Sequence, residues 1–125
     1  MVGVLGLAAA AAGLVSACAA GQVPQVERVA TAFATGDPAT RCALLAPATR
    51  AAVEHDRPGA CPDTVAGGTR PGGQVQHVEV WGDQALVRVA GDTLFLTRAG
   101  DGWAVSAAGC APAGEAPYAC RLEGP

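Results

Sequence analysis

The fold is decided by residues 77–107, which read HVEVWGDQALVRVAGDTLFLTRAGDGWAVSA. Apolar and polar residues alternate along this stretch with the period of two that is typical of half-buried β-strands. Turn signals interrupt the alternation at Gly82-Asp83, at Gly91-Asp92 and at Ala99-Gly100-Asp101-Gly102, with the spacing of successive hairpins. The stretch therefore predicts a four-stranded antiparallel meander.

The three turns can be checked against one another, because each of them fixes which residues face each other across two strands. Two-residue turns at the first two sites and a four-residue turn at the third predict six apolar pairs: Val80 with Ala85, Val78 with Val87, Val89 with Leu94, Val87 with Leu96, Leu96 with Val105, and Leu94 with Ala107. The opposite face carries polar and charged residues: His77, Glu79, Gln84, Arg88, Thr93, Thr97 and Ser106. One consistent apolar face indicates a sheet that helices cover on that side.

The residues before this stretch follow the period of a helix. Apolar residues recur at helical spacing over residues 23–33, and Gly36 is expected to end that helix. A second helix is predicted to begin with Asp37 as its N-cap and Pro38 at its first helical position. A third, short helix is predicted over residues 48–53.

Two further segments complete the predicted α+β domain. Arg57–Gly73 is rich in proline and glycine and is expected to be a loop that Cys61 pins to the rest of the domain. A last short strand is expected over Tyr118–Leu122. The predicted fold class is therefore α+β, with N-terminal helices packed on a curved antiparallel meander of four to five strands.

The first 17 residues carry no charged side chain and are mostly Ala, Val, Leu and Gly. As a helix they would reach only about 25 Å, which is short of the roughly 30 Å hydrocarbon core of a bilayer. This segment is therefore predicted to be a signal peptide. Because such signals usually begin with a basic residue, we expect the natural start of the chain to lie upstream.

The signal ends in Leu14-Val15-Ser16-Ala17-Cys18, which resembles the bacterial lipobox. In that motif an aliphatic residue and two small residues precede the cysteine that is lipid-modified and becomes the first residue. The resemblance implies a lipidated tether over residues 18–21 and an exported domain over residues 22–125. Two alternatives remain: cleavage by an ordinary signal peptidase at the small residues Ala17 and Ala19, or a structural role for Cys18.

Once Cys18 is set aside, an even number of cysteines remains: Cys42, Cys61, Cys110 and Cys120. Four cysteines suit two disulfides, with three pairings open, and disulfides require an oxidising compartment. Nearest-neighbour pairing would join Cys42 to Cys61 and Cys110 to Cys120, and each bridge would stabilise the domain by about 3 kcal/mol. Zinc is the alternative, but the sequence has no C-x-x-C pair.

Several short segments of the exported part resemble a known family: Cys42-Ala43-Leu44-Leu45-Ala46-Pro47-Ala48-Thr49-Arg50, Phe95-Leu96, Gly102-Trp103, Ala107-Ala108-Gly109-Cys110 and Pro117-Tyr118-x-Cys120. The chain is similar to small secreted lipoproteins of actinobacteria with a nuclear-transport-factor-2-like (NTF2-like) domain. The resemblance implies a cone-shaped α+β fold, disulfides and membrane anchoring, and it implies no particular chemistry.

Enzymes of the broader NTF2-like superfamily place an acid, a base and a tyrosine between sheet and helices, whereas the predicted apolar face of this chain carries no ionisable side chain. His55 and Asp56 are the adjacent titratable pair that would fold over the mouth of such a cavity; the alternative is a solvated helix end. His77 lies beside Glu79 and across from Arg88, which indicates a cross-strand charge ladder rather than a metal site.

Two groups of apolar side chains are candidates for binding. Trp103, with its neighbours Leu94, Leu96 and Val105, is predicted either to pack in the core or to line a small pocket. Trp81, Leu86 and Phe95 are predicted to lie on the outer face, where they would form a partner surface or a homodimer contact. Tyr118 is expected to pack over the disulfide of Cys120.

The net charge of −3 and the pI near 5.2 argue against nucleic-acid binding. We therefore expect a non-enzymatic binding or protein-interaction module, lipid-anchored on the outer face of the cytoplasmic membrane, with no cofactor and no metal. Its expected partners are the membrane itself and either a second copy or another extracytoplasmic protein. The alternatives are a secreted isomerase or dehydratase that uses the cone cavity, and a sensor of a small apolar ligand with Trp103 in its pocket.

Overall fold

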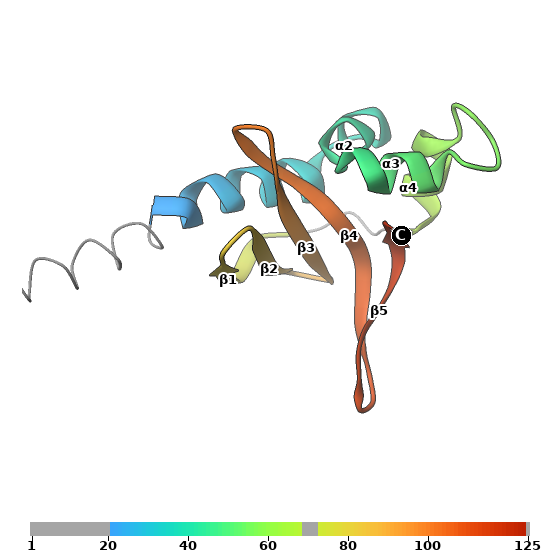
Figure 1. Ribbon diagram of the computed structural model, residues 1–125. Helices are drawn as coiled ribbons and strands as arrows, with labels where there is room; N and C mark the ends of the chain where they lie inside the picture. Colours follow the sequence, from blue (N-terminus) through green and yellow to red (C-terminus); the bar gives the residue numbers. More distant parts are fainter. Residues whose placement is uncertain (1–20, 69–72, 125) are drawn as a thin grey trace, which may run out of the picture.

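The computed structural model describes residues 21–68 and 73–124, and these form four helices and one five-stranded sheet (Figure 1). The elements follow in this order: a helix over residues 21–35, then α2 (Pro38–Leu44), α3 (Pro47–Val53), α4 (Cys61–Gly68), β1 (Val75–Trp81), β2 (Gln84–Val89), β3 (Asp92–Ala99), β4 (Gly102–Ala113) and β5 (Ala116–Glu123). Neighbouring strands in the sheet are also neighbours in the sequence. The predicted α+β class and the antiparallel meander are therefore confirmed.

Predictions about the first 20 residues lie outside the described residues. These are the signal peptide, the lipobox and the lipidation of Cys18. Within the described part, no helix has both the length and the apolar character that crossing a bilayer requires.

The first hairpin has the predicted register, with Val80 opposite Ala85 and Val78 opposite Val87. The second hairpin corrects the prediction. Val89 faces Asp92, Val87 faces Leu94 and Ala85 faces Leu96, so that Ala90 and Gly91 make the turn. Gly91 there adopts a φ of +91°, a conformation that glycine reaches without strain. The predicted pairing of β2 with β3 was therefore wrong by two residues. Because side chains alternate between the two faces of a sheet, a shift by an even number of residues leaves every side chain on its predicted face.

The third hairpin is correct near its turn, where Leu96 faces Val105, and wrong beyond it, where Ala107 faces Phe95 instead of Leu94. A β-bulge causes this difference, because Ser106 is an extra residue in β4. Its hydroxyl donates a hydrogen bond of 3.2 Å to the carbonyl of Phe95. The bulge moves Ala107 from the predicted inner face to the outer face, beside Phe95.

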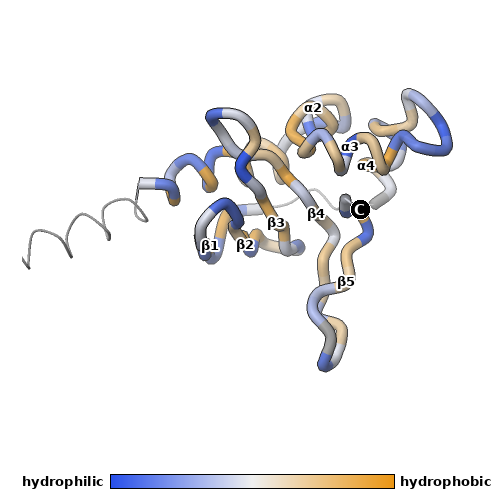
Figure 2. The backbone as a smooth tube through the Cα atoms, viewed as in Figure 1, coloured by the Kyte–Doolittle hydropathy of each residue, from blue (hydrophilic) through white to orange (hydrophobic). Residues whose placement is uncertain are grey.

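One core lies between the inner face of the sheet and the helices. Its members include the following side chains of the 21–35 helix, of α2 and its end, and of the strands: Val26, Ala30, Phe33, Cys42, Leu45, Val87, Leu94, Leu96, Trp103 and Val105. The helical stripe and the apolar sheet face predicted from the sequence therefore meet as expected. In Figure 2 hydrophobic stretches run along β3 and β4, while the loop after α3 is hydrophilic.

Arg41 of α2 is 5 % exposed and closes the C-terminal end of the 21–35 helix. Its guanidinium donates hydrogen bonds to the carbonyls of Gly36 (3.0 Å) and Ala34 (3.2 Å) and lies 5.7 Å from the centre of the Phe33 ring. A buried cation with acceptors at a helix C-terminus is stabilised both by hydrogen bonding and by the helix dipole. Arg41 thus holds the first helix against α2.

The segment Arg57–Gly73 is not all loop, as the composition indicated, because residues 61–68 form α4. Pro62 occupies the second position of the helix, where its missing N–H is not needed, and Asp63 lies in the first turn, where a negative charge is favourable. Val65 is fully buried in the core. Burial of Cys61 and Val65 outweighs the helix-breaking tendency of the glycines at the end of α4.

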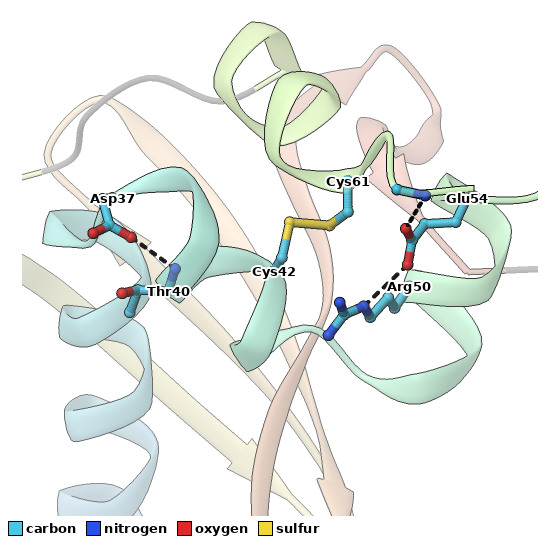
Figure 3. The surroundings of a disulfide bond; sticks show 7 residues. Asp37, Thr40, Cys42, Arg50, Glu54 and Cys61 are labelled. Atoms are coloured by element: carbon cyan, nitrogen blue, oxygen red, sulfur yellow. Dashed lines mark hydrogen bonds and ion pairs between the residues drawn. A yellow bond between two sulfur atoms is a disulfide. The ribbon is translucent and has the colours of Figure 1, made fainter. Parts of the chain in front are cut away.

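Both nearest-neighbour disulfides are present, so that this pairing is confirmed among the three that were open. Cys42–Cys61 joins α2 to α4 with 6.0 Å between the Cα atoms, as Figure 3 shows. Cys110–Cys120 joins β4 to β5 across directly paired residues, with 4.0 Å between the Cα atoms. The cysteines that a zinc site would need are thus used in disulfides.

Two surface carboxylates near the first disulfide accept hydrogen bonds from backbone N–H groups. Asp37 caps α2, as predicted, and accepts a hydrogen bond of 2.8 Å from the Thr40 N–H. Glu54 accepts hydrogen bonds from the Arg50 guanidinium (3.1 Å) and from the Gly59 N–H (2.7 Å). The Thr40 N–H lowers the pKa of Asp37 from its ordinary 3.8, and the hydrogen bond from Arg50, followed by that from Gly59, lowers the pKa of Glu54 from its ordinary 4.5.

These lowered pKa values predict that the free energy of unfolding decreases at low pH, in the part of the stability curve called here the acid limb. A carboxylate whose pKa is lower in the folded chain stabilises the fold above its unfolded pKa, and this contribution is lost as the pH falls through the folded pKa. The free energy of unfolding should therefore decrease as the pH falls below about 4.5, the ordinary pKa of Glu54. Urea titrations between pH 7 and pH 2 measure this decrease.

The double variant Asp37→Asn/Glu54→Gln should show a flatter acid limb, because asparagine still caps the helix and neither new side chain titrates. Asp101→Asn, in an exposed turn, is the matched control and should keep the slope of the unsubstituted protein. An acid limb that the double variant leaves unchanged would rule out this assignment.

Candidate functional site

The outer face of the sheet carries the candidate partner surface. Trp81, at the end of β1, is 49 % exposed, while Leu86 is 7 % exposed and lies between Glu79 and Phe95 in the sheet. The three predicted members of this surface are therefore not equivalent. Trp81 is open to solvent, Leu86 is covered by its neighbours, and Phe95 is half-buried in a groove.

The groove is a shallow cavity of about 360 Å³ beside Phe95. Its lining comes from β2, β3, β4, β5 and the residue that follows β5: Gln84, Phe95, Ser106, Ala107, Pro117, Tyr118, Cys120, Glu123 and Gly124. The rings of Phe95 and Tyr118 meet edge to face, with their centres 5.3 Å apart and an angle of 71° between their planes. Tyr118, which was expected to pack over the Cys120 disulfide, is found here in an aromatic wall with Phe95.

The bulge in β4 builds this groove. It places Ala107 directly beside Phe95, and the small side chain leaves the ring uncovered on that side. Gln84 lies at one border, where its amide donates a hydrogen bond of 2.8 Å to the Thr97 hydroxyl. Glu123, which faces Ala107 across the β4 and β5 pair, is the residue with a formal charge among those that line the groove. The groove thus combines an aromatic wall with one carboxylate.

The sequence pointed to Phe95 and did not point to the rest of the lining. Tyr118 and Glu123 were not grouped with Phe95, because they come from a strand more than 20 residues later in the chain. The one local signal was Ser106, a polar residue in the strand of Val105 and Ala107. It marks the bulge only once the register on both sides is known.

The alternative pocket around Trp103 is packed core. Leu94, Leu96 and Val105 are at most 1 % exposed, and Trp103 is 6 % exposed. The indole N–H of Trp103 donates a hydrogen bond of 3.1 Å to the amide oxygen of Gln22 in the first helix. The placement of these four residues agrees with the core-packing alternative, and none of them lines the groove beside Phe95.

His55 and Asp56 are both exposed in the turn after α3. His55 lines a shallow depression of about 540 Å³ with Ala48, Ala51 and Ala52 of α3. A second depression, of about 590 Å³, lies on the exposed side of the first helix, beside Glu27 and Arg28. Both depressions are lined by a single helical segment, so that His55 does not lie at a mouth between helices and sheet, as the enzyme alternative requires.

His77 and Glu79 lie side by side on β1, with 3.1 Å between the imidazole Nε2 and a carboxylate oxygen, and Arg88 faces His77 across the β1 and β2 pair. The three side chains thus share the predicted face, and the close contact among them runs along β1 from His77 to Glu79. Over residues 21–68 and 73–124, the structure brings no three His, Cys, Asp or Glu side chains together in a way that would hold a metal ion.

Comparisons with protein-family models, with curated proteins and with solved structures find no match to this chain. Any function must therefore be argued from the cysteines, the groove and the ends of the domain.

Proposed function

We propose that this protein is a membrane-anchored extracytoplasmic lipoprotein that acts as a non-enzymatic binding module. The observation that carries the proposal is the use of the cysteines. The two disulfides take up four of the five, and the one left over is Cys18, in the lipobox-like stretch Leu14-Val15-Ser16-Ala17-Cys18. A thiol that has no partner in these bridges and follows two small residues is suited to acylation.

The compartment follows from the same bridges. Disulfides persist in oxidising environments and are rare in the cytosol. Bacterial lipoprotein modification adds two or three acyl chains to the cysteine, and two chains suffice for stable anchoring where one does not. The proposed location is therefore the outer face of the cytoplasmic membrane.

The finer fold assignment also belongs to this proposal. Helices that cover one face of a five-stranded antiparallel sheet fit an NTF2-like cone, and the resemblance in sequence to NTF2-like lipoproteins points the same way. In the enzymes of that superfamily the cavity between helices and sheet serves catalysis, whereas in this chain the space is filled by the core around Phe33 and Leu96. The groove beside Phe95 lies on the other face.

The groove is proposed to bind an extended segment of a partner protein that carries an apolar residue and a basic residue two positions apart. In an extended segment such residues point to the same side. The apolar side chain would pack against Phe95 and Tyr118, and the basic side chain would lie near Glu123, the charged residue of the lining. His55 and Asp56 contribute nothing to this surface, and the enzyme alternative gains no support from their position.

Acylation of Cys18 is tested by growing cells that produce the protein with a radiolabelled fatty acid. We expect the label in the mature protein, its loss in Cys18→Ala, and accumulation of the unprocessed form with globomycin, which inhibits the lipoprotein signal peptidase. Cys110→Ala/Cys120→Ala is the matched control and should keep the label, because those cysteines serve the fold. An unlabelled but exported protein would refute the anchor.

Binding in the groove is tested by nuclear magnetic resonance titration of the domain with a short peptide that carries leucine and arginine two positions apart. Resonances of Phe95, Tyr118 and Glu123 should shift, and Glu123→Gln should weaken binding about two- to five-fold, the size of one exposed charge pair. The same peptide with glutamate in place of arginine is the control and should bind more weakly. Equal responses to both peptides, or shifts away from the groove, would contradict this assignment.

A further inference from the structure

At one end of the domain, the start of the first helix lies beside two turns of the sheet. The Arg98 N–H donates a hydrogen bond of 2.9 Å to the carbonyl of Asp83, which joins the end of β3 to the turn after β1. The Arg98 guanidinium and the Trp103 indole both donate to the side-chain oxygen of Gln22, at 2.9 Å and 3.1 Å. Gln22 is therefore fixed to the end of the sheet that carries both turns.

The length of chain before Gln22 places this end close to Cys18. Gln22 comes four positions after Cys18, and four consecutive Cα-to-Cα steps span at most about 14 Å even when fully extended. The polar headgroup layer on one side of a bilayer is roughly 5–8 Å thick. If Cys18 carries the lipid, as proposed above, the end of the sheet that holds Gln22 must lie in or just above the headgroups.

Trp81 lies at this same end, on the outer face. It is the last residue of β1, directly before the turn Gly82-Asp83. Within the part of the chain that the structure describes, it is the large hydrophobic side chain that stands out as exposed, at 49 %. Tryptophan is enriched at membrane interfaces, because its ring is largely apolar and its N–H still needs a hydrogen-bond acceptor.

We propose that Trp81 inserts into the headgroup region of the membrane that holds Cys18 and thereby fixes the orientation of the domain. The inference rests on the proposed function, since it needs the lipid at Cys18. The two turns and the end of β3 carry Asp83, Arg98 and Asp101, with a formal sum of −1, and Glu79 precedes Trp81 by two residues on β1. Anionic lipid therefore gives no extra attraction, and the contact depends on the ring.

This orientation directs the opposite end of the sheet away from the bilayer. β4 starts at Gly102, beside the membrane end, and its 12 residues extend for about 40 Å to Ala113. The hairpin of β4 and β5 projects far from the start of the first helix in Figure 1. Glu115, in the turn of that hairpin, is thus the natural position for a control reporter.

Quenching of tryptophan fluorescence tests the inference. The lipidated full chain is placed in phosphatidylcholine vesicles that contain a bromine-labelled lipid. Trp81 and Trp103 are the tryptophans of the chain, so that the emission of Trp81 is obtained both from Trp103→Phe and from the difference between the unsubstituted protein and Trp81→Phe. We expect the Trp81 emission to shift to shorter wavelength and to lose most of its intensity to the brominated lipid.

The control is Trp81→Phe/Glu115→Trp, whose new tryptophan should keep both its wavelength and its intensity. Mass spectrometry of the same preparation shows whether Cys18 is acylated, and it therefore distinguishes a failure of the Trp81 inference from a failure of the proposed anchor. Acylated, vesicle-bound protein whose Trp81 is not quenched would overturn the inference and leave the anchor standing. Unmodified Cys18 would overturn both. A blue-shifted Trp81 that the brominated lipid does not quench, in a protein that dimerises, would assign the surface to a second copy and also overturn the inference.

Discussion

Phe33→Ala is expected to lower the free energy of unfolding by about 3–5 kcal/mol, the largest effect that we predict for a single substitution in this domain. Phe33 is 1 % exposed and belongs to the core that the first helix shares with the sheet. Alanine would remove the ring from this contact and leave a cavity. It would also remove the aromatic face that lies 5.7 Å from the buried guanidinium of Arg41. The loss would be a large part of the roughly 5–15 kcal/mol that stabilises a typical domain.

Urea denaturation followed by circular dichroism measures this loss as a lower midpoint at an unchanged slope. Trp81→Ala is the matched control, because it removes an exposed aromatic ring and should change stability by no more than about 0.5 kcal/mol in solution. If the two variants unfold at the same urea concentration, Phe33 does not pack between the first helix and the sheet.

Removal of the Cys42–Cys61 disulfide should cost about 3 kcal/mol in the double variant Cys42→Ala/Cys61→Ala. The bridge spans 19 residues and restricts the unfolded chain, and both cysteines are almost fully buried, at 3 % and 0 % exposed. Alanine is preferred to serine because a hydroxyl at these positions would need a hydrogen-bond partner in the core. The thermal midpoint under non-reducing conditions measures the effect.

The second bridge provides an internal comparison. Cys110–Cys120 spans 10 residues, and the shorter loop should make its removal less costly by about 0.5 kcal/mol. Adding a reductant should lower the thermal midpoint of the unsubstituted protein below that of either double variant under non-reducing conditions. A thermal midpoint that does not respond to reductant would mean that the disulfides do not restrict the unfolded state.

The sequence was sufficient to predict the sheet, because the alternation of apolar and polar residues is a local signal that repeats from strand to strand. Alternation along β2 and β3 determines which side chains face the helices, and a turn misplaced by two residues cannot change that. The position of the second turn was not predictable in this way. Asp92 joins β3, where its carboxylate accepts a hydrogen bond of 3.1 Å from the N–H of Gly109, 17 residues later. A turn signal read locally does not contain that contact.

The difference between local signals and tertiary contacts also explains why the sequence did not predict α4 or the lining of the groove. In α4, local composition favoured a loop, whereas the burial of Val65 and the bridge at Cys61 favour the helix, and both of these are tertiary effects. In the groove, Phe95 and Tyr118 meet only because β4 bulges at Ser106 and β5 returns along it. Neither contact leaves a pattern in its own segment.

The most direct test of the proposed lipoprotein is the mass of the N-terminal peptide of the mature protein, extracted from membranes and digested. We predict that Cys18 is the first residue of this peptide and carries a diacylglyceryl group, while the other four cysteines are recovered as two disulfide-linked pairs. A mature N-terminus that lies beyond Cys18, or an unmodified thiol at that position, would contradict the proposal.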